Sequence, residues 1–163
     1  MGYKLIALDI DGTLLNSSNQ ITENVKEAIR KSKEKGVKVV LCTGRPLKGV
    51  ENFLDELNLK EEGDYVSTFN GALVQDAHTG KPISHLTLDY EDLCDLYDLS
   101  VEVGSRSHFY DTRTVYTFNR EVSDYTILEA YLTGVHLNVT ELDEVPKDIA
   151  MSKFMMIDHP EIL

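Results

Sequence analysis

The sequence predicts an α/β fold for the first half of the chain and a separate α+β unit for the second half. Up to Gly71, short apolar runs alternate with helical patterns, which is typical of a parallel sheet with helices on its faces. After Gly71, pairs of strands alternate with helices instead. The chain has 163 residues, 42% of them hydrophobic, so it is long enough to bury a core of this kind.

The first predicted helix lies between two predicted strands. Residues 5–8 form a short apolar run bounded by charge, and residues 37–42 form a second run rich in valine. Both runs predict buried strands. Between them, Thr22 is a suitable N-cap and Gly36 a suitable stop for a helix. The apolar residues with helical spacing are Ile21, Val25, Ala28 and Ile29.

A second helix and a third strand complete the first half. Pro46 is placed to open a helix. The apolar stripe of this helix consists of Val50, Phe53, Leu54 and Leu57. Residues 64–69 then predict a third strand, which ends at Asn70-Gly71. Three strands separated by two helices indicate a parallel sheet.

The second half begins with a predicted hairpin, because residues 72–75 and 82–88 read as strands on either side of a turn. A helix closed near Gly104 follows, with an apolar stripe of Leu93, Leu96, Tyr97 and Val101. The remaining pattern predicts strands at 107–111 and 114–119, a helix at 121–134, and strands at 135–140 and 153–158. We place the boundary at residues 82–86, which gives domains of residues 1–83 and 84–163.

Composition excludes several classes of function. Lys and Arg number 16 against 28 Asp and Glu, so the net charge is −12. This charge argues against nucleic acid or an anionic membrane surface as the partner. Cys42 and Cys94 are far apart and predict reduced thiols. The five histidines have no spacing typical of metal ligands. The absence of a long apolar run and of a signal-peptide pattern predicts a soluble, cytoplasmic protein.

Two aspartates follow the first predicted strand. Asp9 lies at its carboxyl end and Asp11 in the loop just beyond, which is the edge where ligands bind in open α/β sheets. Two carboxylates so close favour a hard cation such as Mg²⁺ between them. An ordinary Asp-Gly turn is the alternative that spacing alone leaves open. A calcium-binding EF-hand loop is excluded, because Thr13 and Leu14 stand where that loop needs Asp or Asn and then Gly.

Three motifs together resemble one family. "LDIDGTLL" (residues 8–15) is similar to the DxDGT motif of the haloacid-dehalogenase-like hydrolases, and "VVLCTGRP" (39–46) to their second motif. The longer TGRP, followed by "FNGA" (69–72), resembles the Cof-type branch, and the whole stretch is most similar to the YidA-type sugar-phosphate phosphatases. The resemblance implies a Rossmann-like parallel-sheet core with an inserted α+β cap domain, truncated within the cap.

The resemblance implies a role for each residue of the first two motifs. Asp9 would be the nucleophile that attacks phosphorus, and Asp11 the general acid and then the general base. Mg²⁺ would be the cofactor, bound by the Asp9 carboxylate and the Asp11 backbone carbonyl. The Thr13 hydroxyl is expected to brace one of these aspartates. The phosphoryl group would be bound, through backbone N–H groups and one hydroxyl, by Ile10, Gly12, Thr43 and Gly44.

Two further candidates each have two interpretations. Arg45 could hold phosphate bidentately, or it could pair with an acid at the edge of the sheet. Asn70 could line the substrate entrance, as the family pattern suggests, or it could simply form an Asn-Gly hairpin turn. The residues alone do not decide between these alternatives.

The family also uses a lysine and a second acidic motif, and neither is found in this sequence. The resemblance therefore implies a chain that stops within the cap, either as a fragment or as a truncated gene product. Such a chain should be weakly active at best. An open sheet edge and an unpaired cap sheet are expected, and a homodimer is one way to cover them.

The leading functional hypothesis is a Mg²⁺-dependent phosphatase acting on small phosphorylated metabolites, with sugar phosphates as the expected substrates. A phosphosugar mutase is the alternative among enzymes. A catalytically incompetent remnant that binds phosphate is a further alternative, because the lysine and the second acidic motif are missing. A phospho-acceptor signalling module is disfavoured, since the third predicted strand runs into "STFNG" and carries no aspartate at its end.

Overall fold

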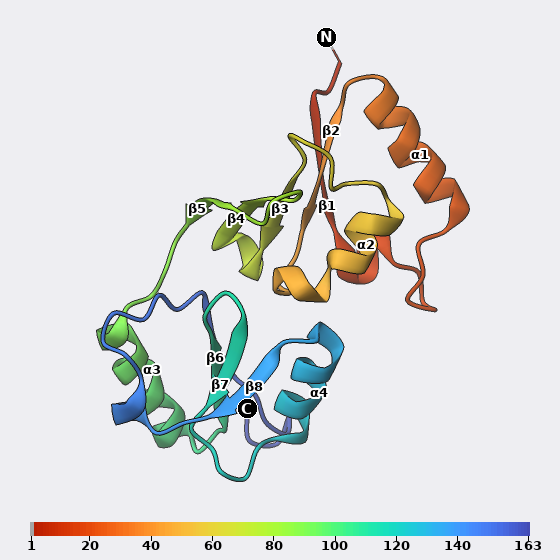
Figure 1. Ribbon diagram of the computed structural model, residues 1–163. Coiled ribbons are helices and arrows are strands. Elements are labelled where there is room, and N and C mark those ends of the chain that lie inside the picture. Colours follow the sequence, from red (N-terminus) through yellow and green to blue (C-terminus); the bar gives the residue numbers. More distant parts are fainter. Residues whose placement is uncertain (1) are drawn as a thin grey trace. The chain divides into compact units, whose positions relative to one another are not determined.

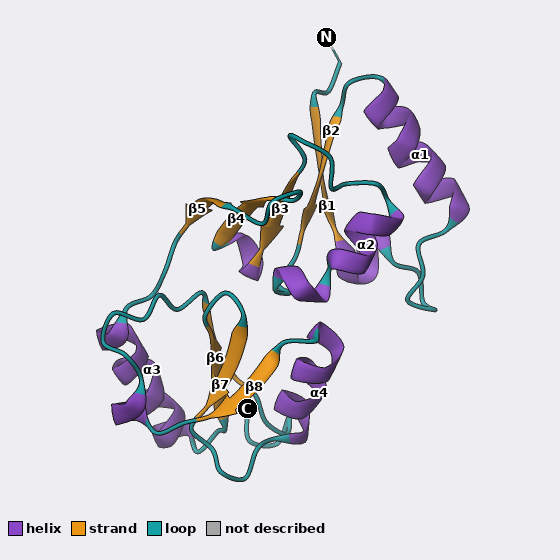
Figure 2. Ribbon diagram, in the orientation of Figure 1, coloured by secondary structure: helices purple, strands orange, loops and turns teal. Residues whose placement is uncertain are grey.

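The computed structural model describes residues 2–163. Contacts divide the chain into two compact units, an N-terminal unit that ends at His85 and a C-terminal unit that spans Leu86–Leu163. Both units contain helices and strands (Figure 2). The predicted α/β architecture is confirmed, and each unit has its own sheet.

The N-terminal unit is built on a five-stranded sheet whose order, β1-β2-β3-β4-β5, follows the chain (Figure 1). The first three strands pair in parallel, and the last two add to them as an antiparallel hairpin. The strands are β1 (Leu5–Asp9), β2 (Lys38–Cys42), β3 (Tyr65–Thr68), β4 (Leu73–Asp76) and β5 (Pro82–His85).

Helices α1 (Glu23–Glu34) and α2 (Glu51–Glu56) connect the parallel strands. Both helices pack into one apolar cluster with β2 and β3, so they cover the same face of the sheet. Ile29 of α1 and Leu54 of α2 contribute to this cluster. Thr22 takes the N-cap position of α1, and Gly36 ends the helical segment with a left-handed φ of 76°, as predicted.

The prediction of a buried first strand is wrong for β1. Leu5 is 54% exposed, and the exposed and half-buried residues alternate along the strand. The reason is that β1 stands at the edge of the sheet, paired with β2 alone among residues 2–163, and that α1 and α2 cover only one face. Asp9 is therefore exposed, on the face of β1 that α1 and α2 do not cover.

The C-terminal unit contains a four-stranded sheet between two helices (Figure 1). The sheet order is β8-β7-β6-β9. Phe109 packs with α3 on one face, whereas His108 contacts Thr126 of α4 on the other. The elements are α3 (Tyr90–Val103), β6 (Ser107–Tyr110), β7 (Thr114–Thr117), α4 (Asp124–Thr133), β8 (His136–Val139) and β9 (Lys153–Met156).

Local signals set the bounds of α3. Asp89 and Asp92 form a reciprocal capping box at its start, and Gly104 closes it in the left-handed conformation. Val101, predicted on the buried stripe, is 61% exposed. It follows the buried Leu93 by eight residues, which turns it roughly 80° away from that residue around the helix.

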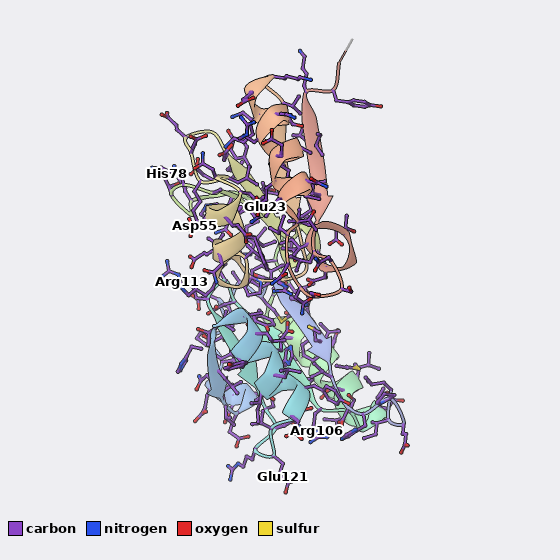
Figure 3. The ribbon with its side chains drawn as sticks, turned by 90° about the vertical axis from the view of Figure 1, so that its right-hand side faces the viewer. Glu23, Asp55, His78, Arg106, Arg113 and Glu121 are labelled. Atoms are coloured by element: carbon purple, nitrogen blue, oxygen red, sulfur yellow. The ribbon has the colours of Figure 1, made fainter. Side chains whose placement is uncertain are left out.

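Arg106, just before β6, binds Asp158 near the C-terminal end of the unit. Its guanidinium donates to both carboxylate oxygens of Asp158, at 3.0 Å and 2.5 Å, and its backbone N–H adds a third bond. Figure 3 labels the Arg106 side chain. Asp158 is buried, and Arg106 holds the pKa of its carboxyl well below the ordinary value.

Candidate active site

The carboxyl ends of the three parallel strands place their side chains side by side. Asp9 of β1 is in register with Cys42 of β2, and Cys42 is in register with Ser67 of β3. Residues in register across adjacent strands project from the same face of a sheet. A pocket opens there, lined by Asp9, Cys42, Thr43, Gly44, Ser67, Asn70 and Gly71.

The turn Ile10–Leu14 carries the rest of the first motif. Gly12 has a φ of 78°, a left-handed conformation that glycine adopts without strain. The Thr13 hydroxyl donates to Asp9 Oδ2 at 3.2 Å, so it braces Asp9 as expected. The Ile10 side chain is fully buried in the core. Any contact of Ile10 with a ligand would therefore be made by its backbone.

Arg45 and Asp11 form a bidentate ion pair. Arg45 Nε lies 2.9 Å from Asp11 Oδ2 and Nη2 lies 2.6 Å from Oδ1. The planar guanidinium matches the two carboxylate oxygens, which makes this a strong, charge-assisted contact. Of the two interpretations of Arg45, this structure contains the pairing with an acid at the sheet edge. The Arg45 guanidinium also lies over the Phe53 ring, 5.8 Å from its centroid.

Thr43 and Asn70 meet where the second motif follows β2. The Asn70 backbone N–H donates to the Thr43 carbonyl oxygen at 2.9 Å. The Thr43 side chain is 5% exposed, and its hydroxyl accepts the Arg45 backbone N–H at 3.2 Å. Asn70 forms part of the β3–β4 hairpin turn and also lines the pocket. The two interpretations of Asn70 are therefore compatible.

The structure brings together most residues singled out from the sequence. Asp9, Thr43, Gly44 and Asn70 line the pocket. Asp11 and Arg45 are joined in their ion pair, and Ile10 and Gly12 belong to the turn after β1. Every candidate lies in the N-terminal unit.

Cys42 and Ser67 line the pocket but were missed in the sequence. Burial raises the pKa of the Cys42 thiol, the Ser67 hydroxyl opposes this, and the charge of Asp9 adds to the rise. Cys42 is therefore a protonated, weakly reactive thiol at neutral pH. A positional signal existed for Cys42, the last residue of the predicted strand 37–42, whereas Ser67 lies inside the predicted strand 64–69 and had no such signal.

The acidic groups suit Mg²⁺ by chemistry and supply few ligands. Asp9 and Asp11 offer only oxygen donors, which this cation prefers. Across residues 2–163, no group of three or more His, Cys, Asp or Glu side chains could hold a metal. Mg²⁺ bound here would take its other ligands from water or a phosphate, as this ion commonly does.

Asp9 and Thr43 place a carboxylate and a hydroxyl at the carboxyl ends of two adjacent parallel strands. This arrangement is typical of the α/β proteins that bind small ligands at that edge of the sheet. The sequence profile of one family, described as haloacid dehalogenase-like hydrolase, matches residues 6–163. The chain belongs to this family, and the resemblance inferred from its motifs is confirmed.

Individual relatives agree with this assignment. YxeH of Bacillus subtilis, which its name assigns provisionally to the phosphatases, is 55% identical over 161 residues, 99% of this chain and 60% of YxeH. The chain thus spans about 60% of the length of this curated relative.

No helix among the described residues is long and apolar enough to cross a membrane.

Solved structures share the fold. A haloacid dehalogenase-like hydrolase from Bacteroides thetaiotaomicron superposes with a TM-score of 0.74 and 28% identity, over 91% of this chain and 56% of that one. BT4131, described as a sugar phosphatase of subclass IIB of the same superfamily, gives a TM-score of 0.66 and 25% identity, over 86% and 54% of the two chains. Both likenesses extend beyond His85, so they include parts of both units.

Proposed function

We propose that this protein is a Mg²⁺-dependent phosphatase that hydrolyses small phosphorylated metabolites, with sugar phosphates as its substrates. The observation that carries the proposal is the position of Asp9 at the end of β1, in a pocket that Thr43 also lines. Asp11 follows two residues later in the turn after β1. The phosphatase name of YxeH supports the reaction, and the sugar-phosphatase description of BT4131 supports the substrate class.

In the proposed reaction, an Asp9 carboxylate oxygen attacks phosphorus while the bond from phosphorus to the leaving oxygen breaks. Asp11 gives a proton to that oxygen and the phosphoryl group stays on Asp9. Asp11 then takes a proton from water, whose oxygen attacks phosphorus, so that inorganic phosphate leaves and the Asp9 carboxylate is restored. Mg²⁺ would be held by the Asp9 carboxylate and the Asp11 backbone carbonyl, and it would supply positive charge that offsets the charge of the phosphate.

The remaining site residues hold the phosphoryl group in this proposal. The Thr43 hydroxyl and the backbone around Ile10, Gly12 and Gly44 supply donors. The pair between Arg45 and Asp11 has to open before Asp11 can give up a proton, because both carboxylate oxygens accept from the guanidinium. A phosphate dianion competes for that guanidinium, so substrate binding itself would release Asp11.

The C-terminal unit is proposed to be part of a cap that selects the substrate, with the chain divided near residues 1–83 and 84–163. Its sheet and helices present no side chain among the candidates above. A cytoplasmic location and a homodimer belong to the proposal as well. The net charge of −12 accords with a small metabolite as the partner, since it disfavours nucleic acid.

Hydrolysis of p-nitrophenyl phosphate with and without Mg²⁺ tests the proposal. The wild-type chain should turn over only with Mg²⁺, and Asp9→Asn should lower kcat on the order of 10³-fold or more, because it removes the nucleophile. Asp98→Asn, an exposed aspartate on α3, is the matched control and should change nothing. A wild-type chain without Mg²⁺-dependent turnover would contradict the proposal and favour a phosphate-binding role without catalysis.

A further inference from the structure

Three consecutive residues after β3 adopt left-handed backbone conformations. Phe69, Asn70 and Gly71 have φ values of 51°, 57° and 93°. This region is uncommon for residues other than glycine and is rarest for bulky side chains such as phenylalanine. Such strain persists only where the surrounding structure holds it, and it gathers at functional sites. The strain therefore indicates that the Phe69–Gly71 turn has a specific role.

The turn is fastened to the segment that follows β2. The Asn70 backbone N–H donates to the Thr43 carbonyl oxygen at 2.9 Å, and the Phe69 backbone N–H donates to the Arg45 carbonyl oxygen at 3.3 Å. The Phe69 side chain is 3% exposed and anchors the turn in the interior. The strained turn thus grips the residues on either side of Gly44.

The Asn70 side chain completes this grip at Gly44 itself. A Cβ atom placed on Gly44 would lie 2.7 Å from Asn70 Oδ1, closer than real Cβ contacts allow, so a side chain at position 44 would displace the Asn70 carboxamide. The φ of Gly44 lies outside the left-handed range, so its backbone does not require glycine. The Asn70 carboxamide thus occupies the space that a side chain at position 44 would need.

We infer that Asn70 is a positioning residue, which holds the Thr43–Arg45 segment so that the Thr43 hydroxyl and the Gly44 backbone face the phosphoryl group. The part of this inference that concerns a phosphoryl group rests on the proposed function. The contact between Asn70 and Gly44 is independent of the proposed function. Asn70 would act on the reaction through the segment that it grips, not by recognising the leaving group.

A double-mutant cycle in unfolding tests the contact. Gly44→Ala should lower the unfolding midpoint of the chain, and adding Asn70→Gly should restore most of that loss, because glycine removes the carboxamide and keeps the left-handed backbone. Gly2→Ala, with no atom within 4 Å of its Cβ, and Asn19→Gly, at a φ of 55°, are the matched controls. Additive effects of Gly44→Ala and Asn70→Gly would overturn the inference.

Kinetics test the positioning role. Asn70→Gly should lower kcat/KM by about 100-fold for p-nitrophenyl phosphate and by the same factor for a sugar phosphate, because a shifted phosphoryl site affects all leaving groups alike. Unequal losses, or an unchanged kcat/KM, would overturn it. A wild-type chain without turnover would contradict the proposed function instead, and the unfolding cycle would still decide whether Asn70 grips Gly44.

Discussion

The ion pair between Arg45 and Asp11 is the contact that most constrains the candidate acid. It joins residues 34 positions apart in the sequence and engages both carboxylate oxygens. A carboxylate held in this way is oriented, and its charge is matched, before any ligand arrives. The pair therefore links the first motif to the second within a single unit.

Replacement of Arg45 by lysine should separate geometry from charge. Arg45→Lys keeps the positive charge but loses the bidentate fork, so we expect kcat/KM for p-nitrophenyl phosphate to fall about tenfold. Arg30→Lys is the matched control, because Arg30 on α1 also pairs with carboxylates and does not line the pocket. Equal activity of Arg45→Lys and wild type would show that the fork has no function.

His108 should make the C-terminal unit sensitive to acid. Its side chain is fully buried, its Nδ1 meets the Thr126 hydroxyl at 3.0 Å, and Nε2 has no hydrogen-bond partner among the described residues. Burial, together with the charge of Lys153, lowers the pKa of His108 to about 4. The folded unit therefore keeps a neutral imidazole over a pH range in which the unfolded chain is protonated.

The sign of the effect follows from that difference. Between pH 6.5 and 4 the unfolded chain binds a proton that the folded unit does not, so stability should fall as the pH falls, by about 3 kcal/mol over the whole window. Urea unfolding at pH 7 and pH 4.5 measures this. His108→Gln should flatten the dependence, while His136→Gln, on exposed β8, should leave it unchanged.

At the scale of single residues, the sequence predicted which residues lie at the site better than it predicted which side chains contact one another. Asp9 and Thr43 stand at strand ends, where a polar residue after an apolar run is visible in the letters. The partner of Arg45 could not be read, because it depends on how two loops approach one another. Ser67 was missed because it lies inside the predicted strand 64–69, where its position does not mark it as a pocket residue.

Among the elements, α1 is tied to the loop before β3 by a partly buried lysine. Lys33 Nζ lies 2.9 Å from Glu61 Oε2 and 3.3 Å from Asp64 Oδ2, and Asp64 is 4% exposed. Burial alone would lower the pKa of Lys33, but these two carboxylates outweigh it and raise the pKa. The contact fixes α1 against the parallel sheet.

Loss of this lysine should destabilise the N-terminal unit. Lys33→Met leaves the buried Asp64 carboxylate without its cation, so we expect a loss of about 2 kcal/mol in the free energy of unfolding. Lys31→Met, which removes an exposed pair with Glu27 on the same helix, should cost less than 1 kcal/mol, as roughly expected for surface pairs. Similar losses in the two variants would contradict the expected difference.

The elements themselves were predictable, and their environment was less so. The apolar runs located the strands, and the helical spacing located α1 and α3, because these signals are local. The burial of β1 was overestimated because a short apolar run does not reveal whether a strand is central or at an edge. That distinction depends on which strands pair with it.

At the scale of the whole chain, the edge of β1 that no strand within residues 2–163 covers predicts self-association. An edge strand exposes unpaired backbone groups that can pair with another chain, and β1 also exposes Leu5. Sedimentation velocity over a range of concentrations should show a dimer, and Leu5→Lys should shift the distribution toward monomer because edge charges oppose pairing. A single monomer at every concentration would contradict the predicted association.

At this scale the family could be recognised from the sequence because three motifs stand in the right order, and the profile match over residues 6–163 agrees. The division into two units could be placed only to within a few residues. Both β5 and the segment after it are short polar and apolar mixtures without a clear linker. Which strand the hairpin joins decides the boundary, and that pairing is a tertiary property.

The order of the strands in the N-terminal sheet has a consequence for biosynthesis. Each strand from β1 to β5 pairs with its neighbour in sequence, so this sheet can assemble as the chain leaves the ribosome. In the C-terminal unit, by contrast, β9 pairs with β6 across the 42 residues from 111 to 152, and Met156 lies opposite Ser107. The pocket at Asp9 would then be shaped in a nascent chain before the later unit has been translated.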